Sequence, residues 1–367
     1  MLRRFCYVCA LQIALCVTAF AAPPLTYNGE VLEWNYGWQK RQCGTLDIKE
    51  NIIEVSGIAC SRVTPGYIWM QSDEREDYII ATDEKGAKRA CKLKMSKTIG
   101  WDWEDMSGGV YEGTNYLFIG SFGDNDEHRK DYRIIYFEEP AIDSVNMPEQ
   151  TVTPNYIRYK YPDGKSHNNE ALMYDNLTNT IYIITKVYYD VCQVFKMPFR
   201  LDYNPADTLT VEYVCDLGVK SDLGESTTGK PYKGFHLVTA ADISPDGKYI
   251  LIKNHNNIVA TYCWVLYWVR QDGETIDDAI KRQPQPIKAY NTYEWQGEAI
   301  CWLDDDTFYT TSDADDGNPP IYKFTRKWGE DIENVQSKNG NRLEMINHTL
   351  YVRSEDGLYA LDGRKVQ

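Results

Sequence analysis

Most of the chain alternates between polar turn segments and short apolar runs, about four to six residues long and rich in Tyr, Ile and Val, as at 116–119 and 181–184. Short apolar runs bounded by turn residues predict β-strands. Pro-Asp-Gly turns at 162–164 and 245–247 separate some of the runs, and only 277–282 has the pattern of a helical turn. The pattern therefore predicts an all-β protein.

A short motif, a small or acidic residue followed by an apolar one, recurs at the start of these runs. Its six copies are Ser56-Gly57-Ile58, Glu104-Asp105-Met106, Glu170-Ala171-Leu172, Ala241-Asp242-Ile243, Glu298-Ala299-Ile300 and Leu343-Glu344-Met345. Irregular repeats of about 40 to 70 residues are typical of β-propeller blades, small sheets that bury their faces by stacking on neighbours. We expect a single β-propeller domain over residues 22–367, with six blades and seven as the alternative.

The ring of blades must also close, because an open array leaves an exposed sheet edge. The run at 29–38 precedes the first motif and has no blade of its own, while the last motif is followed by strand-like runs at 349–353 and 358–361. We therefore expect the N-terminal strand to complete the final blade, so that the two ends of the chain pair.

The innermost strands of a propeller start at one end of the central channel, so the motif residues should gather at one rim. The motifs bring five carboxylates to this rim: Glu104, Asp105, Glu170, Asp242 and Glu298. The ends of the second strands and the adjoining loops add Asp124, Asn125, Arg129, His167, Lys186 and Lys253. A shift of one residue in register would exchange Glu104 and Asp105.

Converging carboxylates repel one another, so their pKa values rise, basic residues neutralise them, or a cation lies among them. Oxygen-rich clusters suit Ca²⁺ best, and the predicted ligands are Asp105, Asp124, Glu170, Asp242 and Glu298. The alternative is an ion-pair network that locks the blades, with Lys186, Lys253, Arg129 and Arg133 as its cations.

The first residues predict a signal peptide over 1–21, with Arg3-Arg4, an apolar stretch and a small-residue cleavage site near Ala21. We expect the mature protein to be secreted, periplasmic or at the cell surface, and monomeric, with no later segment apolar enough to span a bilayer. The formal net charge of −15 disfavours nucleic acid as a partner. It is compatible with an extracellular small molecule, a glycan or a peptide.

Seven of the ten cysteines lie after the predicted leader. An odd number leaves at least one free thiol or an intermolecular bond, and Cys192 with Cys215 is the pair to test first. The cysteine spacings do not match a zinc site. The sequence also has no G-x-S-x-G elbow, no H-E-x-x-H motif and no P-loop.

Two hypotheses about function stay open. One is a binding module for an extracellular ligand, and the other is a metal-assisted hydrolase that uses Asp105, Asp124, Glu170, Asp242 and Glu298.

A combination of motifs resembles a bacterial family of secreted, largely uncharacterised β-propellers related to the TolB and WD40 types. The residues that carry the resemblance are Asp102, Glu104 to Met106, Gly120 to Asn125, Arg133, Glu139-Pro140, Tyr161 to Gly164, Glu170 to Leu172, Lys186, Ala241 to Gly247 and Gln296 to Ile300. More distantly the chain resembles esterase-like phytase propellers, which implies metal-assisted ester or phosphoester hydrolysis. Ser121 and Lys253 depart from the pattern, which usually has Asp and Arg there. The tail at 357–366 is similar to the endings of exported Bacteroidetes proteins.

Overall fold

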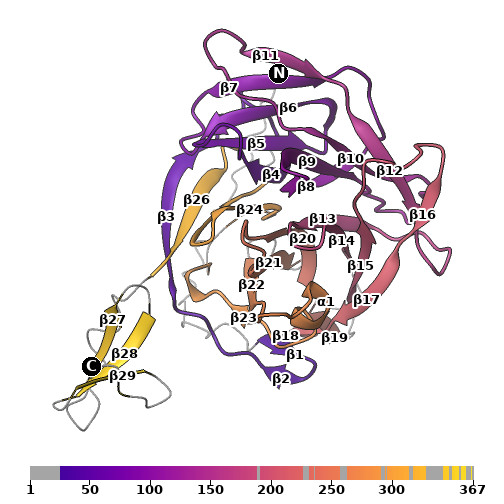
Figure 1. The fold of residues 1–367 in the computed structure, drawn as a ribbon. Helices are drawn as coiled ribbons and strands as arrows, with labels where there is room; N and C mark the ends of the chain where they lie inside the picture. Colours follow the sequence, from indigo (N-terminus) through magenta and orange to yellow (C-terminus); the bar gives the residue numbers. More distant parts are fainter. Residues whose placement is uncertain are drawn as a thin grey trace, which may run out of the picture.

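The chain folds into a five-bladed β-propeller (Figure 1). The computed structural model describes residues 25–187, 191–225, 231–234, 236–256, 263–290, 294, 296–313, 317–327, 342–346, 349–354, 357–360 and 365. The predicted signal peptide at 1–21 lies outside the described residues and stays a prediction. Within the described residues no helix is long and apolar enough to cross a membrane.

The first two blades have five strands each, and the outermost strand of each arrives from a later part of the chain. The first blade contains β4 (Val55–Cys60), β5 (Tyr67–Ser72), β6 (Arg75–Asp83), β7 (Arg89–Met95) and β11 (Glu149–Val152). The second contains β8 (Trp103–Tyr111), β9 (Thr114–Ser121), β10 (Tyr132–Glu138), β12 (Asn155–Lys160) and β16 (Thr208–Thr210). Strands β11 and β16 pair in parallel with β7 and β12, and so cover two sheet edges.

The other three blades have four strands each. The third contains β13 (Asn169–Asp175), β14 (Thr180–Thr185), β15 (Cys192–Pro198) and β17 (Glu212–Leu217). The fourth contains β20 (His236–Ile243), β21 (Tyr249–Asn256), β22 (Cys263–Val269) and β23 (Gln285–Pro286). The fifth contains β24 (Ala299–Asp304), β25 (Thr307–Thr311), β26 (Pro320–Arg326) and β3 (Trp38–Thr45).

Five apolar clusters lie between neighbouring blades and form the described core. Because both faces of a blade are covered by its neighbours, the strands nearest the channel are buried almost throughout: β4 and β13 have no exposed residue. This explains the nearly continuous apolar runs in the sequence. Aromatic pairs within a blade contribute to these clusters, as where Phe308 on β25 stacks on Phe324 on β26 at 4.6 Å between ring centroids.

The expected six blades are corrected to five. The sixth motif lies in β27 (Arg342–Ile346), which pairs with β28 (Thr349–Ser354) and β29 (Gly357–Ala360) in a separate three-stranded sheet. Figure 1 draws this sheet beside the ring rather than within it. An N-terminal strand does complete the last blade of the ring, but that strand is β3, which pairs antiparallel with β26.

A further small sheet and two short helices complete the described elements. The sheet contains β1 (Leu25–Tyr27), β2 (Glu30–Val31), β18 (Val219–Glu225) and β19 (Pro231–Gly234). The α-helix α1 (Ile276–Ala279) lies in the connection between β22 and β23 of the fourth blade, and the 3-10 helix η1 (Lys288–Tyr290) lies between β23 and the fifth blade. The Tyr27 hydroxyl donates to the carbonyl of Ile280 at 2.8 Å, so the start of the described chain is held against the connection between β22 and β23.

Candidate site at the channel mouth

Irregular strand pairing marks the start of the innermost strand in four blades. The register shifts between Val55 and Gly57, Trp103 and Met106, Asn169 and Ala171, and Val238 and Ala240. A β-bulge leaves a residue unpaired and redirects its side chain, and bulges are common near functional sites. The residues within these four irregular positions are Ser56, Glu104 with Asp105, Glu170 and Thr239. In the fifth blade Glu298 directly precedes the innermost strand, β24. In the fourth blade Asp242 therefore lies three residues beyond the bulge.

Three of the predicted acids, Glu104, Glu170 and Glu298, interact electrostatically with one lysine, Lys186. The Lys186 Nζ lies 2.7 Å from Glu170 Oε2, and the two side chains are only 8% and 4% exposed. Burial lowers the pKa of Lys186, but the carboxyls of Glu170, Glu298 and Glu104 outweigh burial and raise it. Lys186 therefore stays charged in the channel. We call Glu104, Glu170, Lys186 and Glu298 the central cluster.

Acidic groups outnumber cations in and around this cluster, so several of the acids favour their protonated form. Burial raises the pKa of Glu298 to about 8, opposed by Lys186 and helped by Glu170. Burial and the charge of Glu170 raise the pKa of Glu104 well above its usual range. Asp73, just after β5, has its pKa raised to about 7 by burial and by Glu54, Asp313 and Glu170. Two of the predicted outcomes of crowding, raised pKa values and a neutralising lysine, thus occur together.

Asp73 Oδ1 and His255 Nδ1 are among the buried polar atoms near the cluster that have no protein partner within the described residues. His255, on β21, is 5% exposed. Burial and the nearby charges of Lys186 and Lys253 lower its pKa to about 3, so its imidazole is neutral. A buried polar atom without a partner costs free energy unless water or a ligand satisfies it. These two atoms therefore offer contacts to a bound molecule.

Two other predicted acids, Asp105 and Asp242, tie blades together. Asp105 is fully buried and accepts hydrogen bonds from the backbone N–H groups of Met106, Leu172 and Ala241 at 2.8, 2.9 and 3.0 Å. It thereby connects the second, third and fourth blades. Burial raises the pKa of Asp105, and these donors oppose the rise.

Asp242 connects the fourth blade to the second and the fifth in the same way. It accepts from the backbone N–H of Trp302 at 2.8 Å and from the Ser107 hydroxyl at 3.2 Å. Burial raises its pKa to about 6, and the Trp302 bond opposes the rise. Asp105 lies near the start of β8, as the motif predicted, but Asp242 is the seventh of the eight residues of β20, so its expected position at a strand start is corrected. The oxygens of both acids are used inside the protein.

Lys253, the second predicted cation, serves the contact between the fourth and fifth blades. Its Nζ lies 2.7 Å from Glu294 Oε2, both side chains being fully buried. It also donates to the carbonyls of Thr311 and Ala299 at 2.7 and 3.1 Å. Glu294 was not predicted, because it lies in a connection outside the repeated motif and its role arises only from packing.

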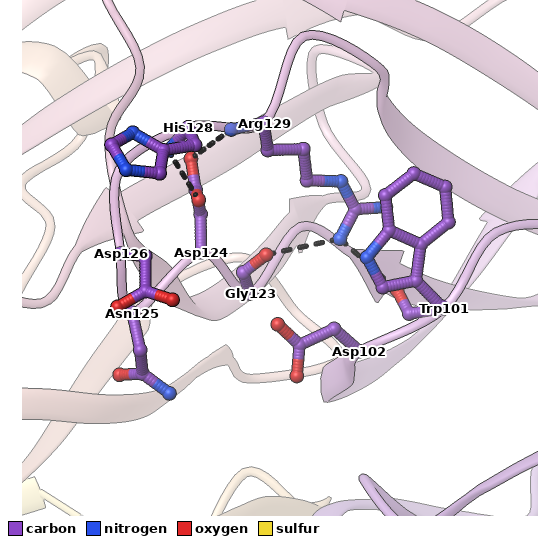
Figure 2. A pocket seen from close by; sticks show the side chains of 8 residues that line it. All are labelled: Trp101, Asp102, Gly123, Asp124, Asn125, Asp126, His128 and Arg129. Atoms are coloured by element: carbon purple, nitrogen blue, oxygen red, sulfur yellow. Dashed lines mark hydrogen bonds between the residues drawn. The ribbon is translucent and has the colours of Figure 1, made fainter.

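A pocket of about 380 Å³ lies beside the cluster, in the second blade (Figure 2). Its lining consists of Trp101, Asp102, Gly123, Asp124, Asn125, Asp126, His128 and Arg129. The Asp124 carboxylate accepts from the backbone N–H groups of His128 and Arg129 at 2.8 and 2.9 Å. Arg129 donates to the carbonyls of Trp101 and Gly123, both at 3.0 Å. Asp124 and Arg129 therefore shape the loop, while Figure 2 shows the Asp102 carboxylate lying across the pocket from Asn125 and Asp126.

Gly123 separates the pocket from the central cluster. A Cβ atom built on it would come within 2.3 Å of Glu104 Oε1 and 2.5 Å of Asp102 Oδ2, so the carboxyls of both acids pack against this glycine. Asn168 makes a second connection, since its side-chain nitrogen donates to Asn125 Oδ1 at 3.1 Å and to Glu170 Oε1 at 3.4 Å. The pocket and the cluster are therefore parts of one polar region. Asn168 was not predicted, although it directly precedes the third bulge.

His167 lies apart from the central cluster. Its Nε2 is 3.1 Å from Asp163 Oδ2, and its ring contacts that of Tyr161 at 4.4 Å between centroids. Of the five predicted metal ligands, only Glu170 and Glu298 belong to the central cluster. In the part of the chain that the structure describes, no three His, Cys, Asp or Glu side chains are grouped so as to hold a metal ion. The calcium site stays a prediction.

The chain is similar to solved β-propeller structures, at low sequence identity. A gluconolactonase from Xanthomonas campestris is 10% identical, with 83% of this chain and 95% of that chain covered and a TM-score of 0.37. A GH43 β-xylosidase/α-arabinofuranosidase from a compost metagenome is 11% identical, with 79% and 94% covered and a TM-score of 0.42. A GH62 hydrolase in complex with xylotriose is 9% identical, with 80% and 98% covered and a TM-score of 0.44.

No protein-family model matches the chain, and no curated protein matches it in sequence. Similarity at this level bears on the fold and not on activity. The class of protein is therefore defined by the chain's own strand pairing: an all-β, five-bladed propeller with a polar channel mouth.

Proposed function

We propose that this protein is an exported propeller that binds an extracellular ligand at the acidic mouth of its channel, and that the ligand presents a positively charged group, such as the amine of a peptide. The observation that carries the proposal is the central cluster, in which one lysine serves three buried or partly buried carboxyls beside a pocket of about 380 Å³. A ligand cation would supply the missing positive charge.

The raised pKa values give this proposal a measurable signature. A cation binds the ionised carboxylates, so near pH 7 it must displace protons from groups such as Glu298, whose pKa is about 8. Its affinity should therefore fall as the pH is lowered, by up to about tenfold per pH unit for each proton displaced. A neutral glycan, the other ligand class that we consider, would bind without releasing protons.

The test is calorimetric titration of chelator-treated protein with a lysine-containing peptide, a xylo-oligosaccharide and Ca²⁺, each in two buffers of different ionisation enthalpy. We expect the peptide to bind with proton release, and Ca²⁺ to compete with it for the oxygens of Glu104, Glu170 and Glu298. Glu170→Gln should weaken binding by at least about tenfold, the effect of losing one charged contact. Glu138→Gln, at an exposed position on β10, is the matched control and should leave binding unchanged.

Binding of the glycan without proton release would reject the cationic ligand and keep the site. Absence of binding to all three probes, or equal binding by the Glu170→Gln and wild-type proteins, would contradict the proposal.

A second candidate is a metal-assisted ester or phosphoester hydrolase at the same site. The specific observation in its favour is the difference between Glu298, with its pKa raised to about 8, and Glu170, whose pKa burial also raises but whose direct pairing with Lys186 at 2.7 Å opposes the rise. One group could donate a proton while the other accepts one. If so, Glu170→Gln should lower turnover of a susceptible ester by at least ~10²-fold, whereas no turnover by the wild-type protein with calcium present would reject this candidate.

A further inference from the structure

Two thiols face each other where the propeller ring closes. Cys60 is the last residue of β4 and Cys301 lies in β24, the innermost strands of the first and fifth blades. Their Sγ atoms are 3.4 Å apart, although 241 positions separate the residues in sequence. Both side chains are buried, at 5% and 1% exposure, within the apolar cluster between these two blades. The contact thus joins the first blade to the last.

The five other cysteines that the structure describes show no comparable contact between two thiols. Cys43, Cys91 and Cys263 direct their thiols toward the backbone carbonyls of Ile321, Met147 and Glu294. Cys192 and Cys215 lie on neighbouring strands, but Cys192 is opposite Leu217 and Cys215 is opposite Val194. The pair expected from the sequence is therefore offset along the strands, whereas the pair at the ring closure is in contact.

We propose that Cys60 and Cys301 form a disulfide that closes the propeller covalently. A disulfide needs a sulfur–sulfur distance of about 2.05 Å, so the two sulfurs must approach by about 1.3 Å, a movement that small side-chain rotations can supply. The oxidant is a second disulfide, either a small-molecule disulfide or an oxidoreductase whose active-site cysteines are in the disulfide form. One cysteine thiolate attacks it to give a mixed disulfide and releases the first thiol of the oxidant. The second cysteine thiolate then attacks the mixed disulfide and releases the other thiol. Two protons and two electrons leave the protein, and the oxidant is reduced to two thiols.

The bond should form during folding rather than afterwards. Burial raises the pKa of the Cys301 thiol well above its usual range, and the adjacent Cys60 raises it further, so in the closed ring the reactive thiolate is scarce. A bulky oxidant also cannot reach a side chain that is 1% exposed. Once formed, the bond is shielded from reductants for the same reason. Since it closes a very long loop of chain, it should restrict the unfolded state strongly.

The test compares the full chain refolded in a glutathione redox buffer with the same chain refolded in reductant. Peptide mapping without reduction should find one cross-link, between the peptides that contain Cys60 and Cys301, and a mass lower by two hydrogen atoms. The oxidised protein should melt on the order of 5 °C or more above the reduced protein, as expected for a long-loop disulfide. Reductant added to the native oxidised protein should reduce the disulfide slowly until the protein is heated.

Variants separate the cross-link from simple packing. Under oxidising conditions Cys60→Ala and Cys301→Ala should each lose the whole increment in melting temperature that oxidation gives, and the double variant should lose no more of that increment. Cys192→Ala with Cys215→Ala is the matched control, which should retain the cross-link and its increment. The oxidatively refolded protein is then unfolded in denaturant, and the proposal is overturned if all ten thiols of the full chain can be alkylated. It is also overturned if mapping finds a cross-link between Cys192 and Cys215 instead.

Discussion

At the scale of single residues, three acids with raised pKa values should lower the stability of the fold as they ionise. The folded-state pKa values of Glu298, Asp73 and Asp242 are raised to about 8, 7 and 6, so the folded protein binds more protons than the unfolded chain up to those pH values. The free energy of unfolding must then fall as the pH rises from about 5 to about 8. His255, with its pKa lowered to about 3, acts in the opposite sense, but only between that value and its ordinary pKa near 6.5.

The first prediction follows from this expected decrease in stability with rising pH. Thermal unfolding of the wild-type protein should show a lower melting temperature at pH 8 than at pH 6. Glu298→Gln should flatten this decline and stabilise the protein at pH 8 by about 1 kcal/mol or more, because the amide does not ionise. Glu138→Gln, at its exposed position, should leave the pH dependence unchanged. A wild-type melting temperature that rises between pH 6 and pH 8 would contradict the raised pKa values.

Much of the residue-scale site could be predicted, and its limits have a physical reason. The repeat brought Glu104, Glu170 and Glu298 to one end of the channel because each occupies an equivalent position in its blade, and Lys186, directly after the second strand of its blade, lies at the same end. The roles of Asp105 and Asp242 could not be predicted. Their partners are backbone N–H groups on other blades, such as that of Leu172, and a sequence pattern does not reveal which oxygens such groups occupy.

At the scale of the strands, Asp105 joins three blades through backbone N–H groups, so its loss should weaken the ring. Asp105→Asn keeps the size of the side chain but replaces one acceptor oxygen by an N–H donor facing other N–H groups. We expect a loss of about 2 to 4 kcal/mol in the free energy of unfolding, measured by urea denaturation, because buried backbone donors lose their acceptor.

The control for this prediction is Asp202→Asn, which alters a side chain that is 77% exposed and 3.5 Å from Arg200. It should change stability by less than about 0.5 kcal/mol. If the two variants were equally stable, Asp105 would not hold the blades together. Strand patterns predict that such an acid starts the strand, but the bulge between Trp103 and Met106 decides which way it points.

At the scale of the whole molecule, the number of blades was the part of the fold that the sequence did not predict. The strands β27 to β29 have the same short apolar pattern as the blades, so the pattern counts them as a sixth blade. Membership in the ring depends instead on which strand pairs with β26, and β3 takes that place. Local periodicity predicts strands well, whereas the choice between two candidate partners far apart in sequence is a property of the folded ring.

The last prediction compares two deletions, one that removes the C-terminal strands β27 to β29 and one that removes most of β3. Removal of 328–367 should leave the ring soluble and reduce its melting temperature little, because the fifth blade already has four strands without β27 to β29. Removal of 26–44 should expose the edge of β26, empty the position of the buried Trp38, and cause aggregation or a large fall in melting temperature. Trp38 packs against Phe308 at 5.0 Å between ring centroids, so Trp38→Ala should reproduce part of the second loss, by about 3 to 5 kcal/mol, without shortening the chain. The reverse order, a stable N-terminal deletion and an unstable C-terminal one, would mean that the C-terminal strands and not β3 close the propeller.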